Sequence, residues 1–142
     1  MSVRVRAPAS FNADWLACEH TGLVQLGCVI VDDDEVFLDV ARALLERDGV
    51  TVAGVAHNSA EAVQLVRALR PEVVLMDIRL GAESGFDAAR QLAGNGQSAA
   101  VIMISTHSGE DYADLIDESP AVGFLPKAEL SAAAVRKILA TD

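Results

Sequence analysis

The sequence predicts an α/β domain in which helices cover both faces of a parallel sheet. After residue 25, short apolar runs of strand-forming residues alternate with segments whose apolar residues recur at helical spacing. Two of the apolar runs, Val29–Val31 and Val73–Met76, end directly on aspartates. Because ligands bind at the carboxyl ends of the strands in open α/β sheets, we expect these aspartates to share one edge of the sheet.

Five strand–helix units account for the chain after residue 25. We expect strands at Leu26–Val31, Thr51–Ala56, Val73–Met76, Ala100–Ile104 and Gly123–Leu125. We expect helices from about Glu35 to Asp48, from Asn58 or Ser59 to before Pro71, from near Gly85 to Ala93, around Glu110–Glu118, and from about Ser131 to Ala140. In the first helix, Val36, Val40 and Leu44 keep helical spacing, and Gly49 is a suitable stop.

Residues 1–25 follow neither period, and we expect a poorly ordered N-terminal extension or a misassigned start. Residues 26–142 are expected to form one domain, because a chain of 142 residues with 51% apolar residues can bury a full core. The longest apolar run, Ala99–Ile104, is far too short to span a membrane. With only Cys18 and Cys28 and no secretory signal, the protein is expected to be cytoplasmic, with Cys28 reduced and buried.

The net charge of −10 comes mainly from two acidic stretches, Asp32–Glu35 and residues 110–118. No basic patch is present that could release counterions from a phosphate backbone, which argues against direct nucleic-acid binding. Asp34 and Glu35 are expected to be acids at a helix start, where the helix dipole favours negative charge. His57 and His107 are expected to be solvated loop histidines.

Asp32, Asp33 and Asp77 are the strongest candidates for a functional site. Carboxylates within about 4 Å of one another repel by roughly 4 kcal/mol per pair at an effective dielectric constant of about 20. A hard divalent cation with oxygen ligands is the simplest way to stabilise such a cluster.

Five segments in order resemble a known family. They are Val31-Asp32-Asp33-Asp34, Val74-Leu75-Met76-Asp77-Ile78-Arg79-Leu80, Gly85, Ile104-Ser105-Thr106 and Gly123-Phe124-Leu125-Pro126-Lys127. Together they resemble the receiver domain of two-component response regulators over about residues 26–141. The resemblance implies a flavodoxin-like (βα)5 fold with a doubly wound five-stranded parallel sheet in the strand order 2-1-3-4-5.

The resemblance also implies that Asp77 accepts a phosphoryl group. Asp33, Asp77 and the backbone carbonyl of Arg79 would then hold Mg²⁺, with Asp32 helping through water. Lys127 would place its charge on another phosphoryl oxygen.

The remaining implied roles concern switching and lifetime. The Ser105 hydroxyl would bind a third phosphoryl oxygen, and Ser105 and Phe124 would form the switch. Arg79 and His107, each two residues past a site residue, occupy positions at which the family sets the lifetime of the phosphoryl group.

The implied function is signalling. The phosphoryl group would come from a sensor histidine kinase or a phosphotransfer protein, and an unknown downstream protein would read the result. The downstream protein would bind a surface formed by the acidic helix, the fifth strand and the last helix. The chain could also form a homodimer through this surface. Beyond self-catalysed phosphoryl transfer and autodephosphorylation, no enzymatic activity is expected.

Three positions depart from the family pattern. Gly81 replaces a usual proline, which we expect to loosen its loop. Ala128 replaces the proline often found after the lysine, which puts the usual cis peptide there in doubt. Ser105 replaces threonine and keeps the hydroxyl.

Because the chain ends at Asp142, we expect a stand-alone receiver. Two other functions are alternatives. The chain could be a fragment of a DNA-binding regulator whose helix-turn-helix output domain is missing. Asp32-Asp33-Asp34-Glu35-Val36 also fits the motif of haloacid-dehalogenase-like phosphatases, which would use Asp32, but only Glu129 and Asp142 follow Lys127 as acids. A scaffold with a degenerate site is disfavoured, because every catalytic residue type is present.

Overall fold

A computed structural model describes residues 26–96, 98–107 and 109–141 of the chain. The extension predicted for residues 1–25 lies outside these described residues, and so does residue 142. None of the helices in the described part is long and apolar enough to cross a membrane.

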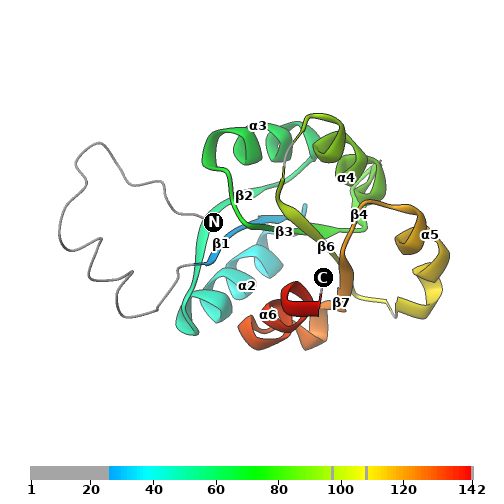
Figure 1. The fold of residues 1–142 in the computed structure, drawn as a ribbon. Coiled ribbons are helices and arrows are strands. Elements are labelled where there is room, and N and C mark those ends of the chain that lie inside the picture. Colours follow the sequence, from blue (N-terminus) through cyan, green and yellow to red (C-terminus); the bar gives the residue numbers. More distant parts are fainter. Residues whose placement is uncertain (1–25, 97, 108, 142) are drawn as a thin grey trace.

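The described strands include a five-stranded parallel sheet in the order β2-β1-β3-β6-β7 (Figure 1). These strands are β1 (Leu26–Val31), β2 (Val50–Ala56), β3 (Val73–Asp77), β6 (Ala100–Ser105) and β7 (Gly123–Pro126). Counted along the chain as five strands, this is the predicted order 2-1-3-4-5, which is confirmed.

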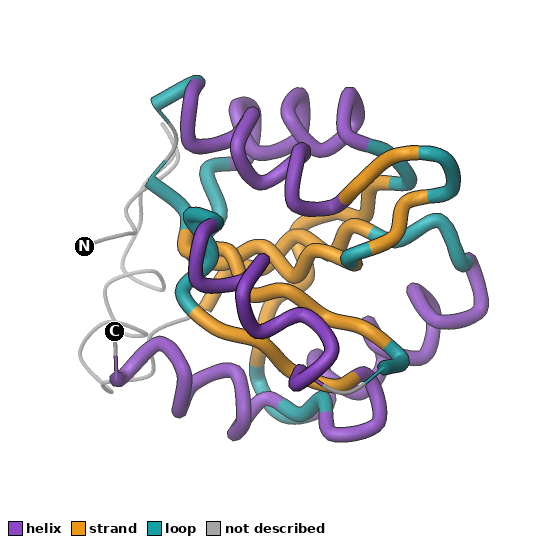
Figure 2. Tube along the Cα trace, turned by 90° about the vertical axis from the view of Figure 1, so that its right-hand side faces the viewer, coloured by secondary structure: helices purple, strands orange, loops and turns teal. Residues whose placement is uncertain are grey.

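Helices cover both faces of the sheet (Figures 1 and 2). They are α2 (Glu35–Arg47), α3 (Ser59–Leu69), α4 (Gly85–Gly94), α5 (Ala113–Glu118) and α6 (Ala132–Thr141). Apolar residues of α2 and α6 pack in one core cluster, whereas those of α3, α4 and α5 belong to a second cluster on the opposite face.

Strand β1 contributes to both cores, because successive side chains of a strand point to opposite faces. Cys28 and Ile30 pack in the α2–α6 cluster, and Val29 and Val31 in the other one. All of them are completely buried, which explains why this strand is apolar throughout. Cys28 is free and buried, as predicted, and its burial raises the pKa of the thiol to about 12.

The acidic segment near Glu110–Glu118 is less helical than predicted. It begins with a 3₁₀ turn, η2 (Gly109–Tyr112), and the α-helix starts only at Ala113. Two physical reasons explain the short helix. Tyr112 at the N-cap position provides no side-chain hydrogen bond. Acidic residues also follow one another at helical spacing, as Glu110 and Asp114 do, and like charges four residues apart destabilise a helix.

The loop after β3 contains an element that was not predicted. It folds into an antiparallel hairpin, β4 (Arg79–Leu80) with β5 (Glu83–Ser84). Gly81 stands first in the two-residue turn with a φ of 61°, where a type II′ turn requires glycine. The residue that replaces the usual proline therefore makes a tight turn possible.

Gly85 allows α4 to start close to the end of β3. Its amide donates a 2.7 Å hydrogen bond to the carbonyl of Ile78. A Cβ at Gly85 would lie 2.8 Å from the carbonyl carbon of Asp77 and 2.9 Å from Cα of Ile78. Backbone atoms cannot yield as a flexible side chain can, so only glycine fits here.

Gly85→Ala is expected to lower the free energy of unfolding by about 1–3 kcal/mol, because the added methyl group overpacks a backbone contact. Gly94→Ala is the matched control, since a Cβ at Gly94 would meet nothing within 4 Å. That variant is expected to be neutral or stabilising by up to about 1 kcal/mol. Urea unfolding of both variants measures the difference. Equal stabilities would contradict the packing argument.

Candidate functional site

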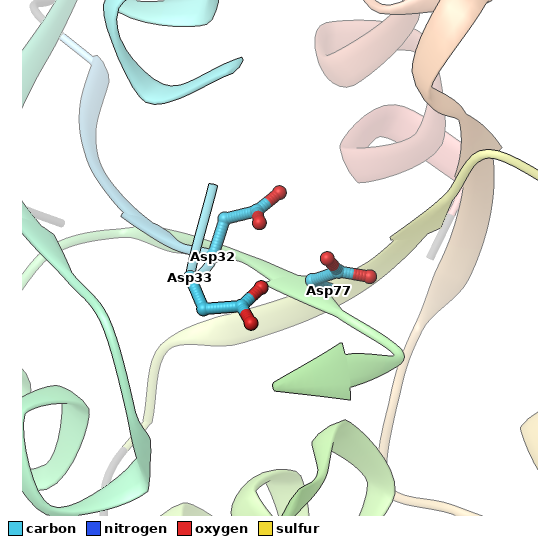
Figure 3. A group of neighbouring side chains, drawn as sticks. All are labelled: Asp32, Asp33 and Asp77. Carbon is cyan, nitrogen blue, oxygen red and sulfur yellow. The ribbon is translucent and has the colours of Figure 1, made fainter. Parts of the chain in front are cut away.

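The acid cluster lies at the carboxyl edge of the sheet. Asp32 and Asp33 directly follow β1, and Asp77 is the last residue of β3. One carboxylate oxygen from each residue lies within 4.8 Å of the other two, and Figure 3 shows the three side chains gathered around a common space. Asp32 is 0% and Asp77 7% exposed, whereas Asp33 is open to solvent. The structure thus brings together the aspartates that the sequence singled out.

Lys127 connects the two buried aspartates. It follows β7, and its Nζ lies 2.6 Å from Oδ2 of Asp32 and 3.1 Å from Oδ2 of Asp77. The same ammonium group lies 4.4 Å from the centre of the Phe37 ring, at which distance a cation–π contact adds to the attraction. The described residues contain no cis peptide bond, so the bond between Lys127 and Ala128 is trans.

Backbone amides hold the other oxygen of each buried aspartate. Oδ1 of Asp32 accepts a 2.9 Å hydrogen bond from the Asp34 amide, and Oδ1 of Asp77 accepts one of 3.1 Å from the Arg79 amide. The Asp34 carboxylate instead accepts from the amides at the start of α2, which confirms it as a helix cap. In the part of the chain that the structure describes, the buried Oδ2 of Asp32 has no hydrogen-bond donor beside its ion pair with Lys127.

The charges of the site alter its proton affinities. Burial raises the pKa of Asp32 to about 6, the nearby Asp77 charge adds to this increase, and the Lys127 ammonium opposes it. Burial alone would lower the pKa of Lys127, but its contacts with Asp32 and Asp77 outweigh that effect and raise the pKa. Lys127 is therefore a permanent positive charge at physiological pH.

Ser105 lies on the other side of Asp77. It is the last residue of β6, which pairs with β3, and it is only 3% exposed. Its Oγ accepts a 3.0 Å hydrogen bond from the His107 amide. Ser105, Lys127 and the aspartates line one pocket of about 300 Å³. Arg79 and His107 are exposed at the same pocket.

Phe124 does not line this pocket but packs next to it. It lies in β7, is partly buried, and belongs to the core cluster beneath α3, α4 and α5. A Cβ at Gly109 would lie 2.8 Å from Cδ2 of the Phe124 ring, so this ring sits directly against the segment that follows β6. His107 is an exposed loop histidine, as predicted, and its ring also lies edge-on to the Tyr112 ring with the centroids 6.4 Å apart.

Two tertiary contacts near the site were not predicted. His57 lies in a loop with its side chain 39% exposed, as predicted, but its imidazole also lies 3.0 Å from Glu35 and 2.9 Å from Glu61, which was not predicted. Hydrogen bonds to the two glutamates raise the pKa of His57. On the other side of the same loop, the Glu83 carboxylate accepts hydrogen bonds from the amide and the hydroxyl of Ser59, at 2.9 and 2.7 Å.

The family of this chain follows from a comparison with family models. Residues 28–139 match the model of the response regulator receiver domain. The chain belongs to this family. Its carboxylates, lysine and serine at the carboxyl edge thus stand in a domain of two-component signalling, and the haloacid-dehalogenase alternative loses its basis.

Individual relatives agree with this family. A putative transcriptional regulator of Pseudomonas aeruginosa is 31% identical over 101 residues, which cover 71% of this chain and 49% of the relative. The transcriptional regulatory protein MctR of Rhizobium johnstonii is 32% identical over 100 residues, 70% of this chain and 47% of MctR. The chain thus spans about half the length of these relatives.

The fold is also that of solved receiver domains. The signal receiver domain of the putative response regulator NarL from Mycobacterium tuberculosis superposes with a TM-score of 0.72 at 26% identity. The match covers 82% of this chain and 95% of that domain.

The site has the chemistry of a hard-cation site. Asp32, Asp33 and Asp77 offer carboxylate oxygens, which Mg²⁺ prefers over nitrogen or sulfur. Their mutual repulsion is only partly offset by the single ammonium of Lys127, which is the one cation that the buried Oδ2 of Asp32 contacts among the described residues. A divalent cation at this edge would therefore be stabilised by the residues that are present.

In metal-free protein, the Asp32 carboxyl is expected to titrate near pH 6, well above its ordinary value of about 4. The folded chain then binds a proton that the unfolded chain has lost. The contribution of Asp32 to the free energy of unfolding therefore decreases as the pH rises from about 4 to about 6. Carbon-13 NMR of the carboxyl group measures the midpoint, and Lys127→Ala should move it higher. A midpoint near 4 in both proteins would contradict the assigned environment.

Proposed function

We propose that this chain accepts a phosphoryl group on Asp77, from a sensor histidine kinase or a phosphotransfer protein, and thereby switches a signalling surface. The observation that carries the proposal is the Lys127 ammonium between Asp32 and Asp77, with Asp33 and Ser105 beside them. A structural ion pair would need one carboxylate for one ammonium. This cluster has more acid than its cation neutralises, which favours a divalent metal ion, and the bound ion would in turn attract the anionic phosphoryl group.

Asp77 is suited to attack phosphorus. Its Oδ1 is held by the Arg79 amide and its Oδ2 by Lys127, so the carboxylate is oriented. A bond forms between a carboxylate oxygen and phosphorus, and the bond from phosphorus to the donor's histidine nitrogen breaks. A Mg²⁺ held by Asp33, Asp77 and the Arg79 backbone carbonyl would neutralise charge on the transferred group.

Two further side chains would bind the transferred group. Lys127 is already within 3.1 Å of Asp77 and would contact one phosphoryl oxygen. The Ser105 hydroxyl, whose oxygen accepts from the His107 amide, keeps its own proton to donate to another oxygen.

Asp32 would reach the cation through water and contribute charge rather than a direct bond. Arg79 and His107 line the same pocket, where their side chains would set how readily water reaches the phosphoryl group.

The added charge would be read at the surface formed by α5, β7 and α6. A phosphoryl group brings close to two negative charges next to Ser105. Movement of Ser105 would shift His107, whose amide it binds, and with it the nearby Gly109, against which the Phe124 ring packs. Such a switch requires two arrangements of this surface, one of which the phosphorylated protein favours. The acidic residues of α5 favour a basic surface on the downstream partner, and self-association through the same surface is an alternative use.

The rest of the proposal concerns the protein as a whole. Residues 26–142 are assigned to the receiver domain and residues 1–25 to an extension that precedes it. A cytoplasmic location fits a domain that receives phosphoryl groups from kinases. No reaction beyond self-catalysed phosphoryl transfer and autodephosphorylation is assigned to the described residues. Relatives of which the matched segment spans about half include transcriptional regulators, so control of transcription is one output that the phosphorylated domain would serve.

Incubation with acetyl phosphate is expected to label Asp77 alone, and only when Mg²⁺ is present. Mass spectrometry locates the label after trapping of the acyl phosphate. Asp77→Asn should abolish labelling, because an amide oxygen is a far weaker nucleophile than a carboxylate. Wild-type labelling of that variant, or a label on Asp32 in the wild-type chain, would refute Asp77 as the acceptor.

Beryllofluoride, which mimics a phosphoryl group, is expected to alter hydrogen exchange over residues 106–130 when Mg²⁺ is present. The expected changes follow from the contacts between Ser105, His107 and the segment against which Phe124 packs. Asp77→Asn with beryllofluoride is the control and should show no change there. Changes confined to the loops around Asp77 would contradict the switch.

A further inference from the structure

The β4–β5 hairpin lies between the metal site and the start of α3. It begins with Arg79, whose amide is bound by Asp77, and its turn approaches Asp33, since a Cβ at Gly81 would lie 3.5 Å from Oδ2 of that residue. A hairpin with two residues in each strand is not stable by itself in water. Its position must therefore come from contacts with the rest of the domain.

Two contacts anchor this hairpin from opposite sides. Leu80 is 3% exposed and belongs to the core cluster beneath α3 and α4. On the solvent side, Glu83 accepts two hydrogen bonds from Ser59, one from the backbone amide and one from the hydroxyl. Both bonds are short and charge-assisted, and they keep the Glu83 carboxyl ionised by lowering its pKa.

The group that Glu83 binds is itself fixed. Ser59 is 93% buried at the first turn of α3, whose N-cap is provided by Asn58. Two residues earlier, His57 lies within hydrogen-bond distance of Glu35, in the first turn of α2. Because Glu35 follows Asp33 by two residues, the loop between β2 and α3 links the Asp33 loop to the hairpin, although it provides none of the aspartates.

We propose that Glu83 is a positioning residue for the cation site. By binding Ser59 it fixes the hairpin relative to the start of α3, which the His57–Glu35 contact links to the loop that carries Asp33. The fixed hairpin then orients the Arg79 carbonyl that we assign as a cation ligand. This inference rests on the proposed function, because it requires the acid cluster to bind a divalent cation. Residues that orient a ligand without touching the metal commonly change metal affinity by about 10–100-fold when they are replaced.

The test is a Mg²⁺ titration of the full nitrogen-15-labelled chain, followed through its amide chemical shifts. Glu83→Ala is expected to raise the dissociation constant for Mg²⁺ by about tenfold. Glu83→Gln should recover much of the affinity, because an amide can still accept from the Ser59 amide and donate to its hydroxyl. Ser59→Ala should give a smaller rise. The double variant should raise the dissociation constant no further than Glu83→Ala alone, because both substitutions remove the same interaction between Glu83 and Ser59.

Glu72→Ala is the matched control. The Glu72 carboxylate accepts a 2.6 Å hydrogen bond from the Gly27 amide, at the opposite edge of the sheet. Loss of that bond should lower stability and leave the Mg²⁺ affinity unchanged. Comparing the two glutamates separates positioning of the cation site from a general loss of stability.

The possible outcomes are distinct. If the wild-type chain binds no Mg²⁺, the proposed cation site fails and this inference fails with it. If wild-type protein binds Mg²⁺ and folded Glu83→Ala binds it equally well, Glu83 only caps α3 and the inference is overturned. Should Glu83→Ala not fold, Ser59→Ala decides, and an unchanged dissociation constant in that variant overturns the inference.

Discussion

The site depends on one ammonium group placed between two buried carboxylates. Lys127 contacts Asp32 at 2.6 Å and Asp77 at 3.1 Å, and so connects the carboxyl ends of β1, β3 and β7. Residues 32, 77 and 127 are far apart in the chain, and only the assembled sheet brings them together, with β1 next to β3 and with β6 between β3 and β7. Breaking a buried ion pair by removing one partner is costly, because a desolvated charge stays behind. The geometry of the edge and the packing of the strands are therefore coupled.

The same arrangement leaves the site with excess negative charge. With three carboxylates and one ammonium, repulsion is relieved in part by the raised pKa of Asp32 and in part by solvent around Asp33. A divalent cation would relieve it further and would favour ionisation of Asp32. Lys127 and the cation would then be available to the incoming phosphoryl group. A site that is electrostatically unfavourable when empty is thus prepared for its ligands.

Sequence alone was sufficient for the sheet and the acids, but not for the contacts that surround them. Strands such as Val73–Asp77 are buried on both faces, so their apolar runs are visible in the sequence, and the aspartates that end them are forced to one edge. The β4–β5 hairpin has too few residues to show a period, and it exists because Gly81 can adopt a positive φ and Leu80 is buried. The contacts of His57 and Glu83 join separate loops, and no local pattern reports on them. The helix of the acidic segment is shorter than predicted for two local reasons, namely charge repulsion between its acidic residues and the absence of a side-chain cap at Tyr112.

Stability with and without Mg²⁺ tests most directly whether the acid cluster is a cation site. Urea unfolding is measured in Mg²⁺ and in NaCl of equal ionic strength, for wild type, Asp33→Asn and Asp34→Asn. Mg²⁺ should raise the unfolding midpoint of wild type and of Asp34→Asn, because a ligand of the folded state stabilises it and Asn caps a helix as well as Asp does. Asp33→Asn should gain far less, since it lacks one carboxylate ligand. No Mg²⁺-specific gain in wild type, or an equal gain in Asp33→Asn, would contradict the assignment.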